Sequence, residues 1–142
     1  MDDFSLVYPM FALVLLTGTV LVLLFRARVR AVQQGSVSST YFRIYQGAVE
    51  PEQSAKASRH FINLFEAPTL FYAACLAGLA THDAAGMLLV LAWLYVAVRV
   101  VHAVVHLGGN RLRHRMRAYF AGWLILIAMW VQVAAHVALA HP

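Results

Sequence analysis

The chain of 142 residues is 62% hydrophobic, has only 12% charged residues and carries a formal net charge of +5 at pH 7. This composition excludes an ordinary water-soluble domain, in which about a quarter of the residues are charged. Nucleic acid is not indicated by the positive charge, because every lysine and arginine lies in one of two blocks, residues 26–59 and 99–117. The sequence therefore predicts an integral membrane protein.

The first predicted span covers residues 6–25, an almost unbroken run of Leu, Val, Phe and Ala. A helix of about 20 residues is about 30 Å long, which matches the hydrocarbon core of a bilayer. The span follows Asp2 and Asp3 and ends against Arg26, whereas a signal peptide begins with a basic segment. We therefore expect a retained membrane anchor.

The second predicted span covers residues 61–80 and follows a polar stretch, residues 31–57, that we expect to be a loop with an amphipathic part. Pro51 lies between two glutamates and fits the first turn of a helix, where its missing N–H costs nothing. The helix is thus expected to begin before the membrane and to enter it near Arg59. Pro68 lies inside the span and predicts a kink.

The third and fourth predicted spans cover residues 87–107 and 118–140, and a basic loop, residues 108–117, joins them. Residues 81–83 are expected to make a very short turn after the second span, so the second and third spans should be antiparallel neighbours. We therefore predict a single all-α membrane domain, 1–142, whose four helices form an up-down bundle. Since both basic segments lie on one side, the positive-inside rule places them in the cytoplasm and both termini outside it.

Two stripes of polar side chains interrupt the apolar spans, and each follows helical periodicity. Spacings of i, i+4, i+7 and i, i+3, i+7 put three residues on one face of a helix. The stripe on the second span consists of Arg59, Asn63 and Glu66, and that on the third of Arg99, His102 and His106. A charge inside a bilayer costs about 2.5–3.5 kcal/mol on insertion scales, so we expect both stripes to turn inward, with Glu66 near Arg99.

Both stripes lie toward the cytoplasmic ends of their spans, next to the basic residues 111–117. One interpretation is purely structural: Glu66 and Arg99 neutralise each other, and nothing binds. The other is a cationic pocket in which arginines hold carboxylates and Glu66 accepts a hydrogen bond from an ammonium group. Glutathione has two carboxylates, one ammonium group and a thiol and fits such a pocket. Nucleotides and lipid headgroups also fit its arginines.

A metal site is a third interpretation of the same residues. His102 and His106 are four residues apart, a spacing at which two histidines on a helix can share one ion, and Glu66 would be a third ligand. The sequence offers no recognisable further ligand. We therefore expect no metal.

These residues resemble the family of membrane-associated proteins in eicosanoid and glutathione metabolism (MAPEG), in particular its microsomal glutathione transferases. The resemblance covers most of the chain. It rests on Arg59-x3-Asn63-x2-Glu66 at the start of the second helix and on Arg99-x2-His102-x3-His106-Leu107-Gly108 in the third, followed by Arg111, Arg115 and Tyr119.

The resemblance implies a trimer of four-helix subunits, with glutathione held as co-substrate between neighbouring subunits and a lipophilic substrate that enters from the membrane. By position it assigns glutathione binding to Arg59, Asn63, Glu66, Arg99, His102, His106, Arg111 and Tyr119. It assigns stabilisation of the thiolate to Arg115, which we expect to be catalytic. A basic residue at the end of the first span also belongs to the pattern, and the candidates are Arg26, Arg28 and Arg30.

Two residues depart from the family pattern. His106 occupies a position where many members have tyrosine, and Met116 one where prostaglandin E synthase has serine, which argues against isomerase activity. The leading hypothesis is a glutathione-dependent transferase or peroxidase that acts on lipophilic electrophiles. The alternative is a non-catalytic protein of the same scaffold that binds another anionic ligand or a lipid.

Overall fold

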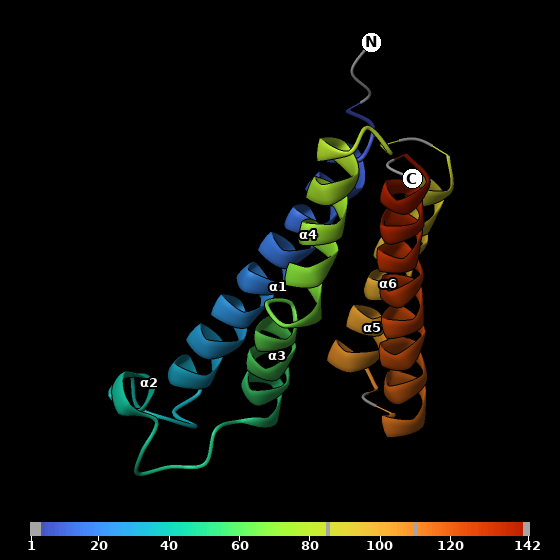
Figure 1. The fold of residues 1–142 in the computed structure, drawn as a ribbon. Coiled ribbons are helices and arrows are strands. Elements are labelled where there is room, and N and C mark those ends of the chain that lie inside the picture. The colour runs from blue at the N-terminus through green and yellow to red at the C-terminus, as the bar shows by residue number, and fades with distance from the viewer. Residues whose placement is uncertain (1–3, 85, 110, 141–142) are drawn as a thin grey trace.

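The computed structural model describes residues 4–84, 86–109 and 111–140, and over these residues all regular secondary structure is helical (Figure 1). The helices are α1 (Val7–Gln33), α2 (Tyr41–Ile44), α3 (Glu52–Asn63), α4 (Ala67–Ala80), α5 (Met87–Leu107) and α6 (Leu112–Ala140). Four helical segments are long and apolar enough to cross a membrane: α1, α3 together with α4, α5, and α6. The predicted all-α membrane bundle is thus confirmed, and the protein is an integral membrane protein.

Side chains from all four spans meet in one apolar core. Leu13 of α1, Phe71 of α4, Tyr95 of α5 and Met129 of α6 are fully buried. The rings of Phe71 and Tyr95 stack with their centroids 4.7 Å apart. In Figure 1, α1 runs beside α3 and α4, and α5 runs beside α6. The opposite faces of the helices expose large apolar side chains, which is typical of a surface that contacts lipid.

The second span is broken between α3 and α4, as the proline in it predicts. Pro68 lies in the first turn of α4, has no N–H to donate, and its ring would clash with the carbonyl of Leu64 in a continuous helix. The chain therefore leaves the helix after Asn63, and Glu66 becomes the N-cap residue of α4 with non-helical backbone angles of φ −87° and ψ −97°. This break confirms the kink and moves Glu66 off the helical stripe expected for it.

Two helices extend beyond the expected spans. α1 continues to Gln33, so the arginines that follow the first apolar run lie on its last turns. α6 begins at Leu112, so Arg113, Arg115 and Arg117 lie on its first two turns, and the expectation of a loop at these positions was wrong. Arginine is a good helix former, and hydropathy marks the apolar part of a helix and not its end.

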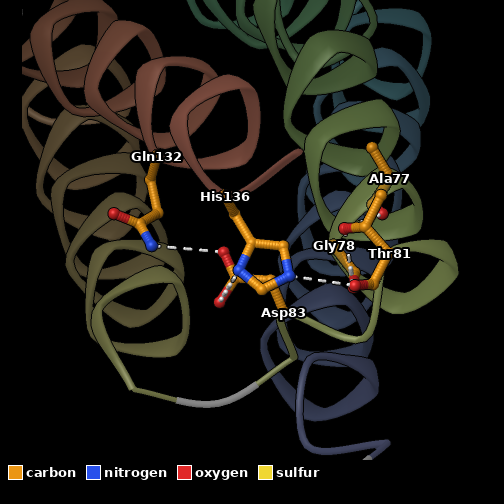
Figure 2. Close-up of polar contacts among 6 residues, drawn as sticks. All are labelled: Ala77, Gly78, Thr81, Asp83, Gln132 and His136. Atoms are coloured by element: carbon orange, nitrogen blue, oxygen red, sulfur yellow. Dashed lines mark hydrogen bonds and ion pairs between the residues drawn. The ribbon is translucent and has the colours of Figure 1, made fainter. Parts of the chain in front are cut away.

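The end of the bundle formed by the α4–α5 turn is held to α6 by polar contacts (Figure 2). Asp83, whose side chain is only 12% exposed, accepts a hydrogen bond of 3.2 Å from Gln132 Nε2. His136 lies with Nδ1 4.0 Å from Asp83 Oδ1 and Nε2 3.0 Å from the carbonyl oxygen of Thr81. A carbonyl only accepts, so His136 Nε2 donates. These contacts fix the turn against the last helix.

Replacing Asp83 tests this contribution. Asp83→Ala removes the acceptor of Gln132 and the carboxylate beside His136, and we expect it to lower the free energy of unfolding by about 1–3 kcal/mol. The measurement is thermal unfolding of the purified protein in detergent. His82→Asn is the matched control, because His82 is the exposed neighbour and its positive φ of 60° is tolerated by asparagine. Equal melting temperatures for the two variants would contradict the expectation.

Candidate functional site

A cavity of about 300 Å³ lies between α3, α5 and α6, at the end of the bundle opposite the α4–α5 turn. Its walls combine basic, aromatic and apolar side chains from these three helices. The lining residues are Arg59, Asn63, His102, His106, Arg115, Met116, Tyr119 and Phe120. Six of the nine residues expected to form a site are thus brought together: Arg59, Asn63, His102, His106, Arg115 and Tyr119.

Arg99 lies behind the wall of this cavity and is only 1% exposed. Its Nε donates a hydrogen bond of 2.9 Å to the Tyr95 hydroxyl, and its Nη1 donates one of 3.2 Å to Asn63 Oδ1. The guanidinium carbon also lies 5.0 Å from the ring centroid of Tyr95 and 5.9 Å from that of Tyr119. All of these partners are neutral, so they stabilise the guanidinium without cancelling its charge.

Glu66 is not paired with Arg99, contrary to expectation. Asn63 lies between them: its Oδ1 accepts from Arg99, and its Nδ2 donates a hydrogen bond of 3.2 Å to Glu66 Oε2. Glu66 is exposed in the turn between α3 and α4, because the break imposed by Pro68 takes it out of the helix. The structure therefore links the carboxylate to the buried arginine only through the amide of Asn63.

Three imidazole rings form a cluster at the inner end of the cavity. His60 is fully buried, and its ring centroid lies 5.0 Å from that of His106 and 5.3 Å from that of His102. Both ring nitrogens of His60 are buried without a hydrogen-bond partner. The sequence interpretation missed His60, which lies directly before the predicted apolar span of residues 61–80 and next to Arg59.

Arg115 and Tyr119 of α6 complete the wall. Arg115 Nη1 lies 3.4 Å from His106 Nε2, and the Tyr119 ring centroid lies 6.1 Å from that of His102. Arg111 is not part of the wall. It is exposed and precedes α6, and its backbone carbonyl accepts the first helical hydrogen bond from Arg115 N at 3.1 Å. The contact of Arg111 with a ligand therefore stays a prediction.

The cavity is positively charged and has an apolar edge. Arg59 and Arg115 are the charged groups among its lining residues, and no carboxylate is among them. Met116 and Phe120 line the same cavity but are 48% and 58% exposed on the outer surface of the bundle. A surface of this kind suits an anionic ligand in the interior and an apolar molecule at the edge.

The arginines at the end of α1 separate into two environments. Arg28 donates a hydrogen bond of 2.8 Å to the Tyr45 hydroxyl and lies over the Phe42 ring, so it holds the α2 segment against α1. Arg26 and Arg30 instead line a second cavity of about 320 Å³ together with Lys56 of α3. The structure thus favours Arg26 and Arg30 over Arg28 as the residues of α1 able to meet an anion.

The histidines do not form a metal site with Glu66. Over the part of the chain that the structure describes, no three His, Cys, Asp or Glu side chains are arranged to hold one metal ion. Glu66 lies in the exposed turn, and His106 Nε2 faces the cationic Arg115. A guanidinium beside a ligating nitrogen disfavours a bound cation.

In a comparison with protein-family models, the chain matches the model described as "MAPEG family" over residues 6–135. No curated protein and no solved structure matches the chain. The matched residues include every side chain of the cavity.

Removing the Tyr95 hydroxyl tests the environment of the buried arginine. Tyr95→Phe leaves Arg99 Nε without its acceptor in the core, and we expect a loss of about 1–3 kcal/mol in the free energy of unfolding. Tyr8→Phe is the control, because Tyr8 is 69% exposed on the outer face of α1. Chemical or thermal unfolding in detergent measures both variants. If Tyr95→Phe is as stable as Tyr8→Phe, the hydroxyl does not stabilise Arg99.

Proposed function

Because the chain belongs to the MAPEG family, whose model covers nearly all of it, we propose that it uses glutathione to conjugate or reduce lipophilic electrophiles. The family includes glutathione transferases and related proteins. The observation that carries the proposal is a cavity with arginines in its wall and apolar side chains at a lipid-facing edge. These two environments suit a reaction between a hydrophilic thiol and an apolar substrate.

Glutathione matches the polar part of the cavity in charge and in hydrogen bonding. Its carboxylates are suited to the guanidinium of Arg59, which lines the cavity, and Arg99 behind the wall adds positive potential. Its ammonium group is suited to the Asn63 side chain and to the exposed carboxylate of Glu66, which are hydrogen-bonded to each other. In this proposal the chain binds both ends of the tripeptide and leaves the thiol near Arg115.

Arg115 supplies the chemistry at the thiol. A free thiol has a pKa of about 8.5, so only a few per cent is ionised at neutral pH. A neighbouring guanidinium that lowers this pKa by about two units makes the thiolate the major form. The thiolate sulfur then attacks the electrophilic carbon, a C–S bond forms, and the leaving group departs with its electron pair. With a hydroperoxide, the thiolate sulfur attacks the terminal oxygen, the O–O bond breaks, and the alkoxide leaves and is protonated to the alcohol. The resulting glutathione sulfenic acid reacts with a second glutathione to give glutathione disulfide and water.

The second substrate is proposed to enter from the membrane. Met116 and Phe120 are both part of the cavity and exposed on the apolar surface, so a lipophilic molecule in the bilayer meets the cavity at these side chains. Holding it against the bound thiolate converts a reaction between two molecules into one within a complex. No water-filled route is required for this substrate.

The proposal includes assembly and orientation. We propose a homotrimer in which α1 of one subunit, with Arg26 and Arg30, contributes to the glutathione site of its neighbour. The basic segments lie in the cytoplasm, and both termini lie on the other side of the membrane, as the positive-inside rule indicates. Exposed Arg111 then lies at the cytoplasmic mouth of the site, where it is suited to an incoming anion.

A second candidate is a non-catalytic protein of the same scaffold that holds an anionic lipid. It is favoured by the exposure of Met116 and Phe120, since a phospholipid could place its phosphate at Arg59 and Arg115 and its chains along these two residues. Lipid that stays bound through purification and is not displaced by glutathione would favour this candidate.

The first prediction for the proposed enzyme concerns Arg115. Purified wild-type protein in detergent is expected to show thiolate absorbance when glutathione is added at neutral pH, and to conjugate chlorodinitrobenzene. Arg115→Ala removes the neighbouring cation and is expected to lower both signals about tenfold or more while the protein remains assembled.

Arg117→Ala is the matched control, because Arg117 is an exposed arginine two residues along the same helix and does not line the cavity. It should retain both signals. Unchanged thiolate absorbance in Arg115→Ala would remove the proposed role of this residue, and absence of glutathione binding to the wild type would refute the proposed function itself.

The second prediction concerns assembly. Native mass spectrometry from detergent is expected to give a mass of three chains. Glutathione binding should be lost when the assembly is dissociated into single subunits, because α1 of a neighbour then no longer contributes its arginines. A monomer that binds glutathione as tightly as the assembly would contradict an intersubunit site.

A further inference from the structure

His106 has a contact that its position in the cavity wall alone does not explain. Its Nε2 lies 3.4 Å from Nη1 of Arg115, the residue proposed to stabilise the thiolate. Resting on that proposed function, we infer that His106, as a neutral imidazole, is the positioning residue that holds the Arg115 guanidinium at the cavity. This assigns a role to a residue that departs from the family pattern.

The contact determines which nitrogen of His106 carries the proton. A guanidinium has N–H donors and no acceptor, so His106 Nε2 must accept the hydrogen bond. An imidazole that accepts at Nε2 is neutral and carries its proton on Nδ1. Protonation at Nε2 would replace the acceptor with a second donor and place two cations side by side.

The surroundings of His106 favour this neutral form. His106 is only 6% exposed, and its ring packs against His60 and His102 with centroids 5.0 Å and 5.7 Å away. The charged groups that act on it are cationic: Arg115 from α6, and Arg59 and Lys56 from α3. Within the described residues, the carboxylates in ion pairs are Glu52, which Lys56 contacts, and Asp83, at the other end of the bundle. A charged imidazole at this place would therefore lack a counter-ion.

His60 fixes the orientation of the ring that makes this contact. The His60 and His106 rings are inclined at 31° to each other, and His60 is fully buried behind His106. His102 packs against both rings at steeper angles of 64°. An imidazole packed in this way has little freedom to turn, so its acceptor nitrogen keeps one direction. The packed rings, which belong to α3 and α5, thus restrict the position of the Arg115 side chain of α6.

Arg115 is suited to such positioning, and its neighbours on the helix are not. Arg113 and Arg117 are exposed and lie two residues away, on the opposite face of α6, whereas Arg115 is half-buried at the cavity. A long guanidinium side chain loses rotamer freedom when it is held in one place. Because His106 Nε2 restricts the rotamers of Arg115 before a ligand binds, the guanidinium is already oriented when a thiol enters the cavity.

Two replacements of His106 distinguish positioning from simple filling of space. His106→Gln places an amide oxygen, an acceptor, near the position of Nε2, and His106→Phe keeps an aromatic ring but has no acceptor. We expect His106→Gln to retain most of the glutathione thiolate absorbance at neutral pH and His106→Phe to lose it about tenfold. Calorimetry measures how much glutathione is bound, so that the absorbance of each variant is expressed per bound glutathione. His114→Phe, at an exposed position of α6, is the control.

Equal thiolate absorbance in His106→Phe and the wild type would overturn the inference, as would a loss in both variants. A loss of affinity in His106→Phe without loss of thiolate per bound glutathione would also overturn it, because His106 would then contact the ligand and not Arg115.

A measurement without glutathione separates this inference from the proposed function. Side-chain nitrogen NMR of the ligand-free protein in detergent is expected to show His106 as a neutral imidazole with its proton on Nδ1, and Arg115→Met should shift the Nε2 resonance. A proton on Nε2, or an imidazolium at neutral pH, would overturn the inference. If the wild type does not bind glutathione, the proposed function is refuted. The protonation site of His106 in the ligand-free protein then still tests whether His106 holds Arg115.

Discussion

The positive charge of Arg99, buried inside an apolar bundle, is the constraint on which the polar half of this structure depends. A charge at membrane depth costs about 2.5–3.5 kcal/mol on insertion scales, so it must be solvated by the protein itself. Tyr95 and Asn63 accept its hydrogen bonds, and Tyr119 adds a ring face. Because all three residues are neutral, they do not cancel the positive charge of the guanidinium. The wall of the cavity is therefore positive before any ligand binds.

The two ends of the bundle are built differently, and the difference suits the proposed chemistry. At one end a short turn between α4 and α5 is tied to α6 through Asp83, so these helices are fixed relative to one another. At the other end the second span is interrupted at Glu66, and α3, α5 and α6 leave a cavity between them. The polar contacts at the first end hold the α4–α5 turn to α6, and at the other end Met116 and Phe120 form an apolar edge of the cavity that is exposed on the outer surface of the bundle.

Much of the fold is predictable from hydropathy, and part of the site from helical spacing. The apolar runs identify four spans, and the stripes that contain Asn63 and His102 do face one cavity. Three features could not be predicted from the sequence, each for a physical reason. Pro68 predicts a kink but not its geometry, which takes Glu66 away from Arg99. Hydropathy does not show where α6 begins. His60 lies next to Arg59 in the sequence, and only the packing of α3 against α5 joins it to the other histidines.

In the proposed complex, a thiol ligand lies in the cavity between α3, α5 and α6 with its sulfur toward Arg115. The most direct test is an experimental structure of the protein in lipid with saturating glutathione. We expect glutathione in this cavity, with its sulfur within hydrogen-bonding distance of the Arg115 guanidinium and a carboxylate at Arg59. Glutathione bound elsewhere, or a lipid headgroup that remains at Arg59 and Arg115 in its presence, would contradict this proposal.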